Sequence, residues 1–152
     1  MTEKSLTTKK YQHMREVMLI LHFIGLTMGL GTSFAHAFLG IATSKMSTDE
    51  ATKFRLHSLV LSRMGNIGIT LLVISGLYLI TPYWAILPSS PLLILKLTLV
   101  VILVVLITLI NLFTKKAKNG DAEGHLKKME RLGKMTLIFG LVIVILAVYI
   151  FH

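Results

Sequence analysis

The chain has 152 residues, of which 54% are hydrophobic and only 15% are charged, and its formal net charge is +9. The absence of cysteine excludes disulfides, thiolate metal sites and cysteine nucleophiles, and we expect no nucleic-acid partner because no aromatic-interleaved basic module accompanies the charge. The apolar residues form four long blocks, approximately 17–41, 64–86, 92–113 and 135–151, each near the length of a bilayer span. The sequence therefore predicts an all-α fold, an integral membrane four-helix bundle with a single membrane domain over 1–152.

The first block, 17–41, has no acidic or basic residue but holds two histidines, His22 and His36. At 3.6 residues per turn, their spacing puts them within about 40° of each other on one helix face and roughly 21 Å apart along the axis. They are too far apart to share one metal ion. Ionisable side chains inside a span are costly and by default mark a functional site. In the same block, the Gly25-x-x-x-Gly29 pattern allows another helix to approach closely.

The connection to the second block begins with Ser47, followed three residues later by Glu50, which is the pattern of a helix capping box. Apolar residues at helical spacing then predict an amphipathic helix that runs continuously into the second block, 64–86. Residues 81–91 are predicted to form a turn, because they contain three prolines and no charge. Tyr83 and Trp84 within this turn are typical of the membrane interface.

The third block, 92–113, is apolar except for Lys96 and Asn111, and the fourth, 135–151, has no ionisable residue. A turn at Asn119-Gly120 and a short helical lead-in are expected between them. The first and third connections carry most of the basic residues: Lys45, Lys53, Arg55, Arg63, Lys115, Lys116, Lys118, Lys127, Lys128, Arg131 and Lys134. The positive-inside rule therefore predicts a multi-pass membrane protein with both termini outside, although the four basic residues of the amino-terminal tail oppose this orientation.

His22 and Lys96 lie equally far inside helices that enter from the same membrane face, so they are expected at the same depth. A neutral imidazole can bind haem iron, copper or zinc, or carry a proton. The alternative for His22 is a packed histidine hydrogen-bonded to a carbonyl or a serine. The Lys96 amine could reach the nearby membrane surface, or it could pair with a haem propionate or an iron-bound ligand.

The opposite end holds a second group of candidates. His36 and His57 are candidate metal ligands, together with His22, and are expected to form a lesser site at the cytoplasmic side. Arg63 could bind a haem propionate or a lipid phosphate. His13, His125 and His152 are expected to be solvated or in a tail. The sequence shows no HExxH helix, no Walker loop and no carboxylate within a span, which argues against proteases and proton-driven antiporters based on such groups.

Three segments resemble a superfamily of small bacterial membrane proteins that includes the CopD-type copper-resistance domains and the HemJ-type protoporphyrinogen oxidases. They are LHFIGLTMGLG, RMGNIGITLLVISGLYL and PLLILKLTLVVILVVLITLINL, which together cover the first three blocks. The matching elements are His22, Arg63 with Ser75-Gly76-Leu77, and Lys96-Leu97. The resemblance implies a bundle that binds b-type haem, with His22 as an axial ligand and Lys96 near the iron. The chain has LGTSFAHAF where the HemJ-type enzymes have a YLPRLFVYH-like end. The resemblance therefore supports haem binding by this chain better than it supports the oxidation of protoporphyrinogen.

Two hypotheses follow. The first is an integral membrane protein that binds haem b through His22, with Lys96 as a second ligand or a propionate partner, and has a redox role. The alternative is a non-catalytic membrane transporter or assembly subunit for metal ions or small molecules. Whether the chain is an enzyme stays open. The expected partners are the lipid bilayer, a porphyrin or an electron-transfer partner, and a second copy of the chain in a homo-oligomer.

Overall fold

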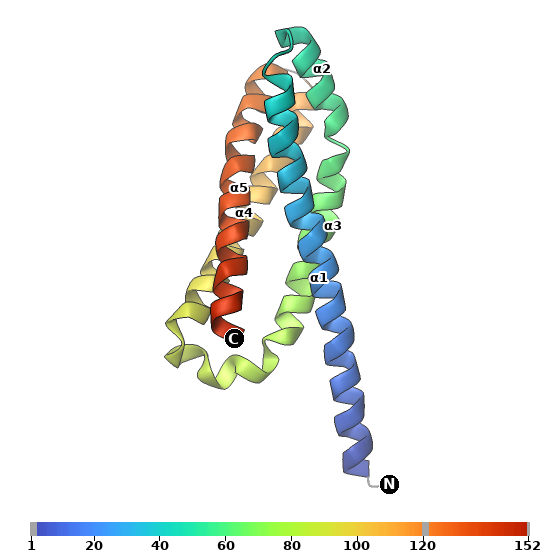
Figure 1. Cartoon of the computed structure of the whole chain (residues 1–152), viewed down its shortest axis with the longest axis vertical. Helices are drawn as coiled ribbons and strands as arrows, with labels where there is room; N and C mark the ends of the chain where they lie inside the picture. Colours follow the sequence, from blue (N-terminus) through green and yellow to red (C-terminus); the bar gives the residue numbers. More distant parts are fainter. Residues whose placement is uncertain (1–2, 120–121, 152) are drawn as a thin grey trace.

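The computed structural model describes residues 3–119 and 122–151 and is all-α, as predicted. In chain order, the elements are α1 (Glu3–Thr43), α2 (Thr48–Ser58), α3 (Leu61–Leu79), the 3₁₀ helix η1 (Thr81–Ser89), α4 (Pro91–Asn119) and α5 (Ala122–Phe151) (Figure 1). Four of these helices contain segments long and apolar enough to cross a membrane: Thr8–Thr43, Leu61–Leu79, Pro91–Asn119 and Glu123–Ile150. The described chain thus has more helices than the predicted four, because α2 and η1 are separate elements.

Helix α1 is much longer than its apolar block, with 41 residues and a length of about 60 Å. The residues before the block contain no proline or glycine, so nothing interrupts the helix between Glu3 and Gly25. Figure 1 shows the amino-terminal part of α1 extending beyond the other helices, away from the α2 end. The basic lead-in of the chain is therefore helical from Glu3 onward.

The predicted capping box is confirmed at the start of α2. The Ser47 hydroxyl accepts from the Glu50 backbone N–H at 3.4 Å, and the Glu50 carboxylate accepts from the Ser47 backbone N–H at 3.2 Å. The hydrogen bond from the Ser47 side chain lowers the pKa of the Glu50 carboxyl. The predicted continuity into the next helix is wrong, since α2 ends at Ser58 and α3 begins at Leu61. Leu59, at the break, is only 5% exposed, so the break allows its side chain to be buried.

Helix α3 ends at Leu79, seven residues before the predicted boundary at 86. The following nine residues form η1, which contains Pro82 near its start and Pro88 within it. Proline lacks the N–H that an α-helix needs and favours turn geometry, so the chain crosses to α4 instead of continuing α3. Pro91 is the first residue of α4, where a missing N–H costs nothing. Helix α5 begins at Ala122, whereas the predicted Asn119-Gly120 turn lies partly outside the described residues.

The helices pack mainly in two pairs, α1 with α3 and α4 with α5. The α1–α3 contact confirms the close approach expected from the glycine pattern, because a Cβ placed on Gly25 would lie 2.8 Å from the Gly68 carbonyl oxygen. Contacts between α1 and α3 keep one antiparallel register, in which His22 faces Ser75 and Thr32 faces Gly65. This close pairing fixes the face that α1 presents to the second pair.

The two pairs meet mainly through α1 and α5, and further contacts join them at the α2 end of the bundle. A hydrophobic cluster there joins α2, α4 and α5, with Leu59, Leu126 and Met129 at its centre. Asn66 and Asn111 link α3 to α4 through reciprocal side-chain hydrogen bonds of 3.0 and 2.9 Å. Elsewhere α3 and α4 contact each other little. The densest core therefore lies at one end, and the middle of the bundle stays less filled.

Candidate functional site

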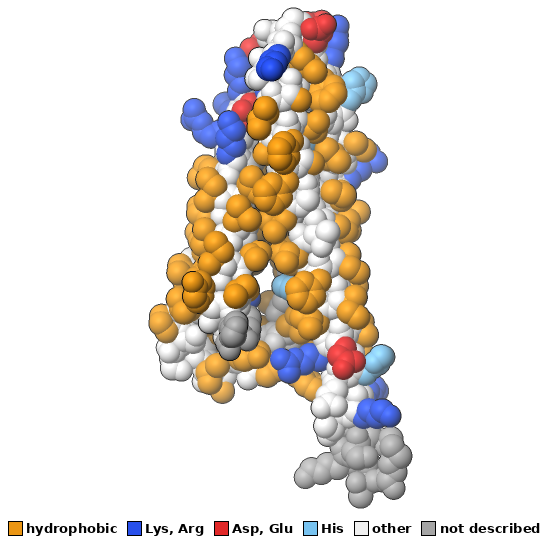
Figure 2. All heavy atoms as spheres, viewed as in Figure 1, with side chains coloured by type: hydrophobic (Ala, Val, Ile, Leu, Met, Phe, Trp, Pro, Cys, Tyr) orange, Lys and Arg blue, Asp and Glu red, His pale blue; other side chains and the backbone are white. Residues whose placement is uncertain are grey.

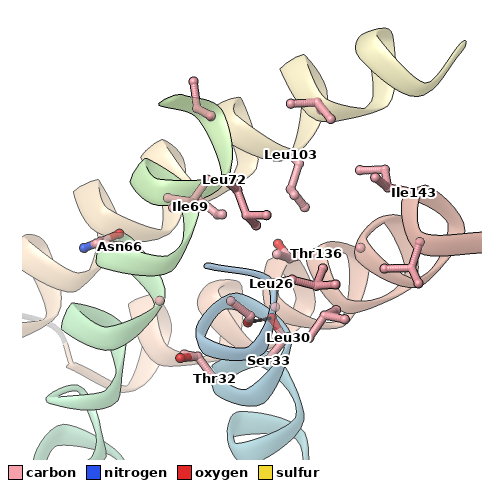
Figure 3. Close-up of a pocket in the computed structure, with 18 of the residues that line it drawn as sticks. Leu26, Leu30, Thr32, Ser33, Asn66, Ile69, Leu72, Leu103, Thr136 and Ile143 are labelled. Atoms are coloured by element: carbon pink, nitrogen blue, oxygen red, sulfur yellow. Dashed lines mark hydrogen bonds between the residues drawn. The ribbon is translucent and has the colours of Figure 1, made fainter. Parts of the chain in front are cut away.

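A cavity of about 1210 Å³ lies between the two helix pairs and is lined mainly by apolar side chains of α1, α3, α4 and α5. On α1 it extends from Arg15 to Ile41. Figure 3 shows one section, with Leu26, Leu72 and Leu103 among the apolar lining residues and Thr32, Ser33, Asn66 and Thr136 among the polar ones. The cavity is therefore the place where the polar residues of the four apolar helices meet.

Helix α1 contributes a stripe of residues spaced by seven, namely Arg15, His22, Gly29 and His36, all of which line the cavity. Seven residues are almost two helical turns, so these positions repeat on nearly the same face. The stripe runs along the edge of the α1–α3 contact, because His22 bonds to Ser75 of α3 and the Gly29 backbone lies against Gly68, and it borders the cavity there. Both histidines of the first block thus face one cavity, as their spacing predicted.

The hydrogen bonds of Ser75 fix the state of the His22 ring. Ser75 is 1% exposed, and its hydroxyl donates its single proton to the Leu71 carbonyl. Its oxygen must then accept the 2.9 Å hydrogen bond that joins it to His22 Nδ1. A neutral His22 therefore carries its proton on Nδ1, which leaves the lone pair on Nε2. Such a second hydrogen bond commonly orients a metal-binding histidine.

Lys96 of α4 and Arg15 of α1 line the same end of the cavity as His22. Lys96 is near the η1 end of α4, and Ser75, which bonds to His22, is near the η1 end of α3, which agrees with the depth match predicted from the sequence. The one acidic residue among the described cavity-lining residues, Glu130, belongs to the opposite end. The His22 end therefore combines an oriented imidazole with two cationic side chains and is suited to an anionic group.

At the α2 end of the cavity, the charged groups are paired with each other. Glu130 accepts from Arg55 at 3.0 Å and from Lys134 at 2.9 Å. Arg55 also donates through Nε to the Thr43 hydroxyl at 3.1 Å. These contacts join α1, α2 and α5 and close this end of the cavity.

The structure does not bring every candidate to the cavity. The side chains of Arg63 and His57 are exposed and do not line it, so Arg63 lies away from His22, and His57 does not join His36. No group of three or more histidine, cysteine, aspartate or glutamate side chains that could hold a metal ion occurs in the described part of the chain. Of the other histidines, His13 is exposed as expected, whereas His152 is outside the described residues.

One expectation about a histidine holds only in part. His125 is partly exposed and not fully solvated, because its ring stacks on Phe113 at a centroid distance of 5.7 Å. Its Nδ1 atom is buried and has no hydrogen-bond partner among the described residues. The predicted lead-in to the fourth span packs against α4, and this contact shields the ring.

Sequence reasoning missed the partners of the site. It offered a hydrogen bond from His22 to a serine as the alternative to a ligand role, and the structure shows that bond, but it did not name Ser75 as the partner. It also did not pair Arg55 with Glu130 or Asn66 with Asn111. The sequence did contain one signal for the asparagine pair. Asn66 and Asn111 each lie in a segment that is otherwise apolar, and a buried amide needs a hydrogen-bond partner.

No family model, no curated protein and no solved structure matches the chain. The candidate site is therefore defined by the cavity, by the Ser75–His22 hydrogen bond and by the cations around it.

Proposed function

We propose that the chain is a multi-pass membrane protein in which the four long helices form a bundle across the bilayer. The surface of these helices supports this, since large apolar side chains such as Phe38 and Ile138 are 69% and 60% exposed. In Figure 2, hydrophobic side chains cover most of the visible bundle, while basic and acidic side chains gather toward its ends. Such a surface is unfavourable in water and suited to lipid.

The proposed orientation places the α2 end at the cytoplasm and η1, with the amino-terminal end of α1, at the periplasm of a bacterial inner membrane. The support is that the basic connections on either side of α2 and between α4 and α5 lie at one end of the bundle (Figure 1). The other end is formed by η1, which has no charged residue. Positive loops favour the cytoplasmic face.

The cysteine-free chain allows a direct test of this orientation. We expect a membrane-impermeant maleimide to label a Ser89→Cys variant in intact spheroplasts, and to label Lys53→Cys only after the membrane is permeabilised. Both positions are exposed on the protein surface, so a difference in labelling would show that the membrane separates one of them from the reagent. The reverse pattern would show that both termini are cytoplasmic.

Within this bundle we propose a b-type haem site at the His22 end of the cavity and a redox role for the protein. The observation that carries this is the Ser75–His22 hydrogen bond, which leaves Nε2 as the lone-pair nitrogen of a neutral ring inside the cavity. This is the state in which a histidine binds haem iron. The resemblance to the CopD and HemJ superfamily points to the same residue.

The residues present fit the size and charge of a haem group. The cavity volume exceeds the roughly 300–1,000 Å³ of ordinary small-molecule pockets, and most of its lining is apolar. His22 would bind the iron, and Arg15 and Lys96 would hold the propionates, with the Lys96 amine as the alternative second ligand. A bound haem would supply reversible one-electron transfer. The protein would hold the ring with apolar side chains and orient His22 through Ser75.

The visible absorption spectrum of the detergent-purified protein, oxidised and dithionite-reduced, tests the proposal. We expect a Soret band and a reduced α-band in the wild type and in a His57→Ala control, because His57 lies outside the cavity. Both bands should be lost in His22→Ala. A colourless wild-type protein that takes up no added haem would contradict haem binding and favour a non-catalytic transporter or assembly subunit.

A further inference from the structure

A second hydrogen-bonding section of the cavity lies toward the α2 end and centres on His36. The His36 side chain is half-buried and lines the cavity, but it makes no hydrogen bond with any other described residue. A neutral imidazole has one donor and one acceptor, and leaving them unpaired in apolar surroundings is unfavourable. This section of α1 therefore presents a hydrogen-bonding group to whatever occupies the cavity.

The opposite wall supplies further donors. The Asn66 and Asn111 amides each use one N–H in their reciprocal pair, and each amide nitrogen keeps a second hydrogen. Both residues line the cavity. In the α1–α3 register set by His22 with Ser75, Asn66 lies at the level of Gly31, which is five residues, or about 7.5 Å, along the axis from His36. Donors thus stand on two walls, offset along the cavity.

The cavity-lining groups around His36 are neutral donors. Arg55 and Lys134 at the cavity end share the single carboxylate of Glu130, so this charged trio keeps a net charge of +1 and lies beyond His36, where Arg55 bonds to Thr43. The section itself offers an imidazole and two amides, which are neutral donors. Neutral carbonyl oxygens match such donors without the desolvation cost of an anion.

The rest of the cavity suits an apolar chain. Between the asparagine pair and η1 the two helices α3 and α4 contact each other little, and the cavity is only partly enclosed. Leu72 on α3 and Leu103 on α4 line this part, as Figure 3 shows. In the proposed orientation this side of the bundle faces lipid, from which a hydrophobic molecule can enter.

We propose that this section binds the head group of an isoprenoid quinone taken up from the bilayer. His36 donates to one ring carbonyl, the asparagine pair donates to the carbonyl on the other side of the ring, and the chain follows the apolar lining. Donors on two walls of the cavity suit a molecule with acceptors at opposite ends of a planar ring. This site does not depend on haem, although a haem at His22 would give the quinone a redox partner in the same cavity.

The test is photolabelling of the full-length protein in phospholipid vesicles with an azido-benzoquinone that carries an isoprenoid chain, mapped by mass spectrometry. We expect labels on the segments around His36 and Asn111, and competition by excess unlabelled ubiquinone but not by a fatty acid. His36→Leu should reduce labelling about three- to tenfold, which corresponds to one lost hydrogen bond. His36→Gln, which keeps a donor, should retain more labelling, and the exposed His57→Leu should match the wild type.

Labels confined to other segments, equal labelling of His36→Leu, or competition by fatty acid alone would each overturn the quinone site. Size-exclusion profiles of the same samples show whether His36→Leu is folded. If it is not, the labelling of His36→Gln, which keeps a hydrogen-bond donor, is compared with the wild type instead. Absorption spectra separate this inference from haem binding. His22→Ala should lose the haem bands and keep the quinone label, so the failure of either site is visible without the other.

Discussion

Gly68→Ala is expected to destabilise the protein by about 1–3 kcal/mol, because the new methyl group would collide with backbone and not with a movable side chain. A Cβ at Gly68 would lie 2.7 Å from the Gly29 nitrogen and 2.9 Å from the Gly25 carbonyl oxygen, so α1 and α3 would have to separate. The intrinsic preference of helices for alanine offsets part of this cost. Thermal unfolding in detergent, followed by circular dichroism, measures the effect.

Gly31→Ala is the matched control for this prediction. Gly31 lies on the same helix as Gly25, but a Cβ there meets no atom within 4 Å. Its replacement should leave stability unchanged or raise it slightly through helix propensity. Equal melting temperatures for Gly68→Ala and Gly31→Ala would show that the α1–α3 contact is looser than described. Gly25→Ala should behave like Gly68→Ala, because its Cβ would lie 2.8 Å from the Gly68 carbonyl oxygen.

Ser75→Ala is expected to weaken haem binding by roughly 10–100-fold, the usual effect of removing a residue that orients a metal ligand. Without the hydroxyl, His22 Nδ1 loses the acceptor 2.9 Å away, and the ring is no longer held in one tautomer. Titration of the haem-free protein with haem, followed at the Soret band, gives the dissociation constant. The loss should appear as weaker affinity with an otherwise similar spectrum, since His22 itself is present.

Ser33→Ala provides the comparison for Ser75→Ala. Ser33 lines the cavity, and its hydroxyl, like that of Ser75, donates to a carbonyl of its own helix (Gly29, 3.2 Å), but no hydrogen bond joins it to His22. Its removal should change haem affinity little. If Ser75→Ala bound haem as tightly as Ser33→Ala, the proposed role of Ser75 in orienting His22 would be wrong.

The sequence predicted those features that depend on one segment alone. The apolar blocks locate the four long helices, the Ser47–Glu50 spacing locates the start of α2, and the fourteen-residue spacing places His22 and His36 on one face. These features follow from helix geometry and local hydrogen bonds, which neighbouring residues determine. Gly25 signalled a close approach, although the sequence did not show that Gly68 is its partner.

The features that the sequence did not predict depend on how helices meet. The break at Leu59 allows that side chain to join Leu126 and Met129, which are far away in the chain. The pairs of Ser75 with His22 and of Arg55 with Glu130 require a specific register between helices. The packing of His125 against Phe113 likewise depends on the α4–α5 contact. No periodicity within one segment contains this information.

The division of the bundle into two pairs affects how the protein folds and matures. The α1–α3 pair precedes the α4–α5 hairpin in the chain, so the hairpin can dock onto α1 around the cavity only after both have been made. A ligand that binds only the docked form adds to its stability by mass action, by about 2.7 kcal/mol at a concentration of 100 times its dissociation constant. Cells that run short of that ligand would therefore accumulate newly made chains with undocked hairpins, which quality-control proteases can reach before maturation is complete.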